Sequence, residues 1–168
     1  MSILDKARAG QGFLEQLANA IPGFQGYREK ELRRDADRIE REHFATRLEE
    51  CKHELDSLSS DASRSGSLDA INDVETARKR LDRLIARLRF ADRGYSGFFD
   101  VTRVDETLLE RVYQFDLGLV TDDTAIVESS EAAGAASDVK AGLAPVIASI
   151  DALAARLSGR EQILSGIK

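Results

Sequence analysis

The sequence predicts an all-α protein, and three observations support this. Apolar residues recur at steps of three and four along several long stretches, only two of the 168 residues are proline, and 32% of the residues are charged. Steps of three and four place apolar side chains on one side of a helix, and a scarcity of proline leaves helices uninterrupted. We therefore expect a long antiparallel coiled-coil hairpin with a helical bundle at its base.

The first long helix is indicated by a narrow apolar stripe whose phase moves by one residue near His43. Most other residues of this stretch are charged, which favours a coiled-coil arm over a globular core helix. Cys51 lies on the stripe and should be a small buried apolar residue; as the one cysteine, it excludes an intramolecular disulfide. The stripe consists of Leu32, Ala36, Ile39 and His43, followed by Phe44, Leu48, Cys51, Leu55 and Leu58.

The second helix follows a serine-rich turn that we predict over residues 59–67. Ser67 is a favourable residue type for an N-cap, and an apolar pattern with seven-residue spacing follows it. Two helices of similar length joined by a short polar turn predict an antiparallel hairpin over residues 28–93. The members of the second pattern are Ile71, Val74, Arg78, Leu81, Ile85 and Leu88.

Two glycine-aromatic segments flank this hairpin, IPGFQGY at residues 21–27 and GYSGFFD at residues 94–100. An antiparallel hairpin brings both segments to the same end, together with Phe90. Two interpretations stay open for them: a structural plug that closes the base of the bundle, or a pocket or exposed patch that binds a partner. The aromatic residues concerned are Phe24, Tyr27, Tyr95, Phe98 and Phe99.

Residues 94–168 are expected to form helices that pack on the hairpin base, so that the whole chain is one domain. Asp105 is placed to cap the first of these helices, and Pro145 predicts a kink or a first turn in the last one. The stretch 129–137 is rich in alanine, serine and glycine, which is typical of a weak helix or a linker.

The N-terminal segment, residues 1–27, is amphipathic. Gly10 and Gly12 interrupt it and it has few basic residues, which favours a short packed helix over a membrane anchor, although anchoring stays open. No apolar run approaches the roughly 20 residues needed to cross a bilayer. We therefore expect a cytoplasmic protein.

Metal and cofactor motifs give little support for catalysis. Glu40 and His43, and again Glu50 and His53, have the Glu-x-x-His spacing of di-iron helical bundles. The two pairs are ten residues apart, about 15 Å of rise and roughly 280° of rotation, and cannot share one site on a single helix. Phosphate-binding glycine loops, nucleophile elbows and zinc spacings are not found. We predict no catalytic residue, metal or cofactor.

Three arginines of the second helix, Arg80, Arg83 and Arg87, share one face at helical spacing. They have two readings: ion pairs with acidic residues of the first helix or of a second subunit, or contacts with an anionic membrane surface. A net charge of -6 disfavours nucleic acid as a partner.

The segments IPGFQGYREKELRRDADR, at 21–38, and RFADRGYSGFFD, at 89–100, resemble a family of small, largely uncharacterised bacterial helical proteins. The resemblance covers roughly residues 20–118, including YQFD at 113–116. It implies an accessory role beside membrane-associated scaffold proteins of the band-7 type, and it transfers no catalytic residue.

These observations lead us to expect a non-enzymatic interaction or assembly protein. It would associate with itself or with a helical protein partner, and would act as an accessory of a band-7-type membrane scaffold at the inner face of the membrane. The alternative is a peripheral protein that binds anionic membranes through the N-terminal segment and the arginine-rich second helix.

Overall fold

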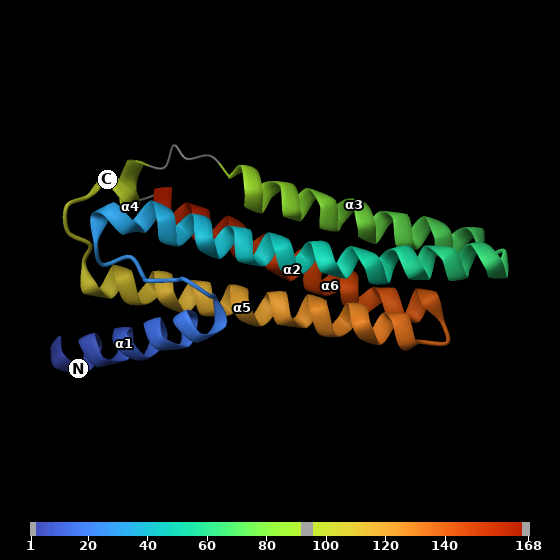
Figure 1. Ribbon diagram of the computed structural model, residues 1–168, viewed down its shortest axis with the longest axis horizontal. Helices are drawn as coiled ribbons and strands as arrows, with labels where there is room; N and C mark the ends of the chain where they lie inside the picture. Colours follow the sequence, from blue (N-terminus) through green and yellow to red (C-terminus); the bar gives the residue numbers. More distant parts are fainter. Residues whose placement is uncertain (1–2, 92–95, 166–168) are drawn as a thin grey trace. The chain divides into compact units, whose positions relative to one another are not determined.

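The computed structural model describes residues 3–91 and 96–165, and 87% of them are helical, with no strand among them. This confirms the all-α prediction. The helices, shown in Figure 1, are α1 (Ile3–Ala20), α2 (Lys30–Ser65), α3 (Leu68–Phe90), α4 (Ser96–Asp100), α5 (Glu106–Ala135) and α6 (Val139–Ser165).

The chain forms two compact units, each built from separate parts of the sequence. Unit 1 comprises residues 1–43, 92–120 and 155–168, and unit 2 comprises residues 44–91 and 121–154. Helices α2, α5 and α6 each contribute one part to each unit. The two units therefore do not coincide with the consecutive segments 1–27, 28–93 and 94–168.

In unit 2, α3 runs antiparallel to the second part of α2 (Figure 1). Ion pairs join these helices, and residue numbers rise along one helix as they fall along the other. They include Glu49–Arg89, Lys52–Asp82 and Asp56–Arg78. The hairpin is not a free arm, because residues 121–154 belong to the same compact unit and pack along it. A four-helix arrangement buries the stripes of both hairpin helices.

The turn predicted over residues 59–67 is shorter than expected, because α2 continues to Ser65. The hydroxyls of Ser57, Ser60 and Ser63 donate to the carbonyl oxygens four residues earlier, which satisfies these serines within the helix. The chain turns at Gly66, whose φ of 71° is readily adopted by glycine. Ser67 caps α3 as predicted, accepting a hydrogen bond from the Ala70 amide at 3.4 Å.

The stretch 129–137 is mostly helical, since α5 continues to Ala135. Asp105 caps α5 as predicted, with its Oδ1 2.7 Å from the Thr107 amide nitrogen. Asp138 accepts from the Lys140 amide at the start of α6, and α6 runs through Pro145.

Helix α6 has the length and apolar composition of a membrane span, with a mean hydropathy of 1.3 over its most apolar window. No other helix of residues 3–91 and 96–165 does. Four of its aliphatic residues, Leu143, Val146, Ile150 and Leu153, are buried inside unit 2. Of the whole apolar window, 28% is buried, and Val139 and Ile147 are half-buried.

Candidate functional site

The predicted aromatic residues of the base that can be placed are buried together in unit 1. Phe24, Tyr27, Phe98 and Phe99 are 4%, 0%, 0% and 5% exposed, whereas Tyr95 lies outside the described residues. The Tyr27 ring meets the rings of Phe24 and Phe98 edge to face, at centroid distances of 5.3 and 5.4 Å. This burial favours a structural plug over an open patch. Phe90, which we expected at the same end of the hairpin, has a side chain that is 82% exposed and is not buried with these residues.

A glycine loop holds Tyr27 in this position. Gly23 and Gly26 have φ values of 83° and 87°, a region that glycine adopts readily and other residues avoid. A Cβ on Gly26 would lie 2.6 Å from the Tyr113 hydroxyl oxygen and 2.8 Å from Leu14. This close approach lets the Tyr27 amide donate a 3.0 Å hydrogen bond to the Tyr113 hydroxyl.

Arg33 forms hydrogen bonds with both the loop before α2 and the segment around α4. Its side chain is fully buried, which is unusual for a charged residue. Its guanidinium donates to the carbonyl oxygens of Tyr27 at 2.6 Å, Val101 at 2.5 Å and Phe98 at 3.3 Å. Burial lowers the pKa of Arg33 from its usual value. The guanidinium also lies 5.8 Å from the centroid of the Phe98 ring.

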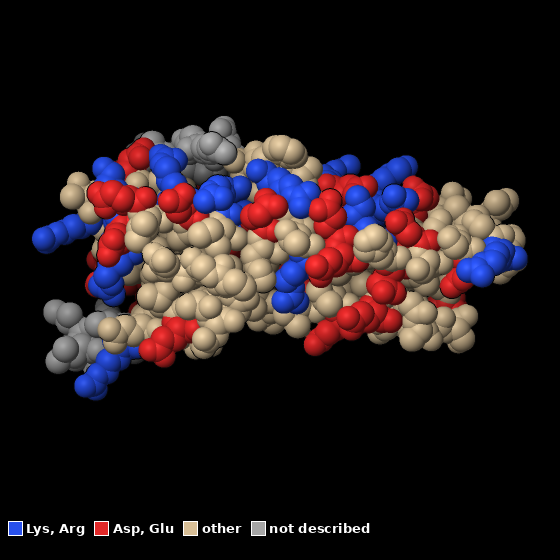
Figure 2. Space-filling view, in the orientation of Figure 1, with Lys and Arg blue, Asp and Glu red and all other residues tan. Residues whose placement is uncertain are grey.

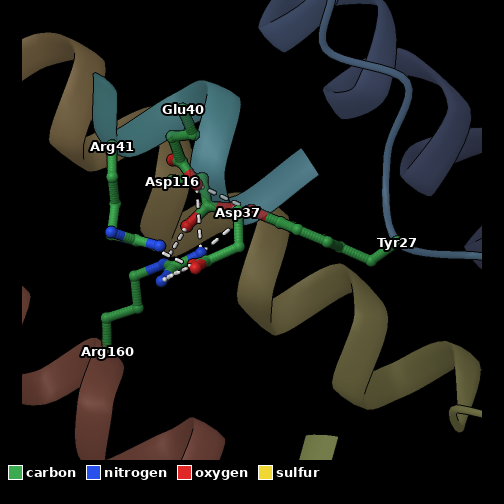
Figure 3. A network of polar contacts seen from close by, with 6 residues as sticks. All are labelled: Tyr27, Asp37, Glu40, Arg41, Asp116 and Arg160. Atoms are coloured by element: carbon green, nitrogen blue, oxygen red, sulfur yellow. Dashed lines mark hydrogen bonds and ion pairs between the residues drawn. The ribbon is translucent and has the colours of Figure 1, made fainter. Parts of the chain in front are cut away.

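Beneath the aromatic plug, Arg160 of α6 is the centre of a buried polar network (Figure 3). Its Nε donates to Asp116 Oδ1 at 2.7 Å and its Nη1 to Asp37 Oδ1 at 2.8 Å. Its Nη2 donates to Glu40 Oε2 at 3.0 Å and to the Tyr27 hydroxyl at 2.9 Å. The Arg160 network comprises Tyr27, Asp37, Glu40, Arg41, Asp116 and Arg160.

The hydrogen-bond distances around Tyr27 require an additional proton. Its hydroxyl oxygen lies 2.7 Å from Glu40 Oε2 and 2.7 Å from Asp116 Oδ2, yet the hydroxyl has one hydrogen to donate. One of the two carboxyl groups must therefore be protonated and donate to Tyr27. Burial raises the pKa of both groups, and that of Glu40 lies well above its usual value.

The proton belongs on Glu40. Asp116 accepts from Arg160 through one oxygen and from Tyr27 through the other, as a carboxylate does, whereas Glu40 Oε1 has no partner. A chain of donation then runs from Glu40 through Tyr27 to Asp116. Asp37 is held between Arg160 and Arg41, whose charges outweigh the effect of burial and lower its pKa. The charged groups are then the carboxylates of Asp37 and Asp116 and the guanidiniums of Arg41 and Arg160, so the Arg160 network has no net charge.

Sequence reasoning missed this network because it assigned charged residues of α2 to the surface. Most buried positions of α2 form one series, 33, 37, 40 and 44, followed by 48, 51, 55, 58 and 62, at unbroken steps of three and four; Ala36 and Ala45, beside this series, are buried as well. The phase change near His43 is therefore wrong: the stripe continues in one phase, with Arg33, Asp37 and Glu40 in core positions. Extending the stripe backwards from Phe44 would have revealed them.

The three arginines of α3 lie in unit 2 and face α6 more than α2. Arg80 pairs with Asp151 Oδ2 at 2.5 Å, and Arg87 donates to the Ala154 carbonyl at 3.0 Å. Arg83 is exposed and, with the other two, lines a pocket of about 130 Å³. The ion pairs with α2 that we expected for this face are formed instead by Arg78 and Arg89, two other arginines of α3.

The predicted metal motifs do not assemble in the part of the chain that the structure describes. Within it, no group of three or more histidine, cysteine, aspartate or glutamate side chains is arranged to hold a metal ion. Glu40 belongs instead to the Arg160 network. No protein-family model, curated protein or solved structure matches this chain.

Proposed function

We propose that this chain is a non-enzymatic interaction or assembly protein whose contact surface is the outer face of α3. The observation that carries the proposal is the position of two exposed apolar side chains, Leu68 at 74% and Phe90 at 82% exposure. They lie at the two ends of α3, about 33 Å apart, and about 40° apart around its axis. They do not form one contiguous apolar patch, and in this proposal they are the two end anchors of a single helical contact.

The surface between these two residues is polar and basic at its middle. Lys79 and Arg83 provide the positive charge. An interface of this kind has apolar anchors with charged groups that select the partner. The expected partner is a helix with an acidic middle, on a second copy of the chain or on another protein. The outward residues of α3 are Leu68, Asn72, Thr76, Lys79, Arg83, Ala86 and Phe90.

The Arg160 network supports a structural role for unit 1. Its titratable groups bond to one another, and none of them lines the three pockets around Cys51, Ile39 and Arg83. A catalytic group needs access to a substrate. A buried network that joins α2, α5 and α6 instead fixes the register of those helices.

The resemblance to small bacterial helical proteins suggests which partner to test first. We include in the proposal an accessory role at the inner face of the membrane, beside a scaffold protein of the band-7 type. Such a scaffold would provide the helical partner for the outer face of α3.

Light scattering after gel filtration tests the proposal. At tens of micromolar, the wild-type chain should elute as an oligomer or retain an added helical scaffold fragment, and Phe90→Ser with Leu68→Ser should abolish the association. Ala132→Ser, an exposed apolar position on α5, is the matched control and should leave association unchanged. A wild-type monomer that binds no scaffold fragment would contradict the proposal.

The second candidate function is binding to anionic membranes, and the arrangement around Arg83 favours it. This exposed arginine lies beside Arg80 and Arg87, two helical turns from the exposed Phe90. Sedimentation with vesicles decides between the two functions. Binding that requires anionic lipid, weakens with salt and is lost in Arg83→Ser would support the membrane function over protein association.

A further inference from the structure

We propose that the loop at residues 21–27, here called the Tyr27 loop, is a pH-sensitive switch: it is closed while Glu40 holds a proton and opens when Glu40 ionises. Opening converts the buried aromatic plug of unit 1 into an exposed apolar surface. The two interpretations of the glycine-aromatic segments, a plug and a partner-binding patch, are then two states of one element. This inference does not depend on the proposed function, since it concerns a different part of the molecule.

The switch follows from the number of protons around the Tyr27 hydroxyl. The hydroxyl oxygen lies 2.7 Å from Glu40 Oε2 and 2.7 Å from Asp116 Oδ2. It also accepts from Arg160 Nη2 at 2.9 Å. With a proton on Glu40, each of these contacts joins a donor to an acceptor. Without that proton, the single hydroxyl hydrogen serves one carboxylate only, and the other carboxylate faces the Tyr27 oxygen with lone pairs on both sides.

The closed loop keeps an ionised Glu40 away from water. Glu40 is 0% exposed, and its Oε1 has no hydrogen-bond partner among the described residues. Figure 2 shows acidic and basic side chains interleaved over the outer surface around α2, where water hydrates them. Glu40 has no such hydration. Because a buried charge without full compensation is unfavourable, ionisation of Glu40 favours a state that lets water reach it.

The neighbouring titratable groups do not replace the lost proton. Burial raises the pKa of Tyr27 well above its usual value, so its hydroxyl stays protonated. Ionisation of Glu40 leaves three carboxylates beside two guanidiniums, one negative charge in excess. The titratable groups that face Glu40 are Tyr27 of the loop, Asp37 of α2, Asp116 of α5 and Arg160 of α6, with Arg41 of α2 beyond Asp37.

Tyr27 is the member of the Arg160 network that can move at the lowest cost. The other members lie on α2, α5 and α6, helices of 36, 30 and 27 residues. Tyr27 lies in the non-helical segment between Ala20 and Lys30, and Figure 3 shows its side chain reaching into the network from this loop. Loops open locally more readily than long packed helices, so the Tyr27 loop should open before the helices separate.

Displacement of Tyr27 would open the aromatic plug. The Tyr27 amide donates to the Tyr113 hydroxyl at 3.0 Å, and the Tyr27 carbonyl accepts from Arg33 Nε at 2.6 Å. Its ring contacts the rings of Phe24 and Phe98. Withdrawal of Tyr27 therefore breaks two hydrogen bonds of its own backbone and uncovers two buried rings. The amide of Tyr27 thus reports directly on whether the loop is closed.

Hydrogen exchange of the Tyr27 amide, followed by NMR from pH 5 to pH 8, tests the switch. After correction for the intrinsic exchange rate, its opening constant should rise by up to about tenfold per pH unit, because opening releases one proton from Glu40. The Val112 amide, in α5 of the same unit, should stay more strongly protected. Equal opening constants for Tyr27 and Val112 would show that unit 1 unfolds as a whole, and would overturn the proposal.

Two variants that cannot ionise at position 40 identify the group responsible. Glu40→Gln and Glu40→Met should both remove the rise with pH, and methionine does so without placing an amide beside Arg160 Nη2. The control Glu50→Gln makes the same change at an exposed carboxylate of α2 and should keep the rise. A wild-type opening constant that does not depend on pH, or an equal rise in Glu40→Met, would refute the switch.

Discussion

Unit 1 and unit 2 are built from successive parts of the same three helices but fill their interiors with different chemistry. Along α2, the buried positions of unit 1 hold Arg33, Asp37 and Glu40, whereas those of unit 2 begin with Phe44 and Leu48. The spacing of the buried positions is the same in both. Helical periodicity therefore fixes which positions face inward, and the residue type decides what holds the helices there.

The difference has an energetic meaning. Aliphatic side chains lose little when neighbouring helices shift slightly, because dispersion contacts are many and non-directional. Arg160 instead has four acceptors at 2.7–3.0 Å on three elements, and a small shift of any helix breaks several bonds. Buried ion pairs contribute more clearly to a unique arrangement than to net stability.

The largest expected effect comes from removing the centre of the Arg160 network. Arg160→Met leaves Asp37 and Asp116 buried without their main partner, and should lower the free energy of unfolding by about 3–5 kcal/mol. Urea unfolding measures this loss. Hydrogen exchange should show the added opening in unit 1 rather than unit 2. The control is Arg64→Met, a substitution of an exposed arginine, which should change the free energy of unfolding by less than about 0.5 kcal/mol. An equally small effect of Arg160→Met would show that the buried polar network does not distinguish the stability of unit 1 from that of unit 2.

The second effect is the pH dependence of unit 1. Folding raises the pKa of Glu40 above its usual 4.5, so the folded chain keeps a proton that the unfolded chain releases. The stability from this group is complete below about pH 4.5 and falls as pH rises toward the folded-state pKa, by up to about 1.4 kcal/mol per pH unit.

Glu40→Gln should remove this dependence, since the amide has no proton to release. Its NH2 can donate to Tyr27 in place of the carboxyl but cannot accept from Arg160 Nη2 as Glu40 Oε2 does. In urea unfolding from pH 4 to 9, the stability of the variant should fall less with rising pH than that of the wild type, so that the variant gains on the wild type between pH 4 and pH 8. Parallel curves for the two proteins would show that Glu40 is ionised in the folded chain.

The smallest effect lies in unit 2, at Asp123. Burial raises the pKa of this group from 3.8 to about 6, with Arg47 opposing the shift. Its stabilising contribution is complete below about pH 3.8 and is lost as pH rises through 6. Asp123→Asn should flatten the unfolding curve within this window only and preserve the contact with Arg47. If Asp123→Asn also changed the pH dependence of the free energy of unfolding above pH 7, the fall in stability from neutral to alkaline pH could not be assigned to unit 1 alone.

Much of the fold was accessible from the sequence, but the Arg160 network was not. The buried stripe of α3 and the caps at Ser67 and Asp105 are local patterns. Arg160 lies three residues beyond Leu157 and continues the α6 stripe, so its burial was detectable by position. The partner that compensates its charge was not detectable, because Asp37 is 123 residues away and only the tertiary fold brings the pair together.

The neutral carboxyl of Glu40 also gives the molecule an intrinsic spectroscopic label. A protonated carboxylic acid has a carbonyl stretching band apart from those of carboxylates and amides, and the unpartnered Oε1 should place it toward the high-frequency side. The band should vanish in Glu40→Gln and survive changes in unit 2. Infrared spectroscopy could then follow the opening of unit 1 during unfolding or partner binding without any added dye or isotope.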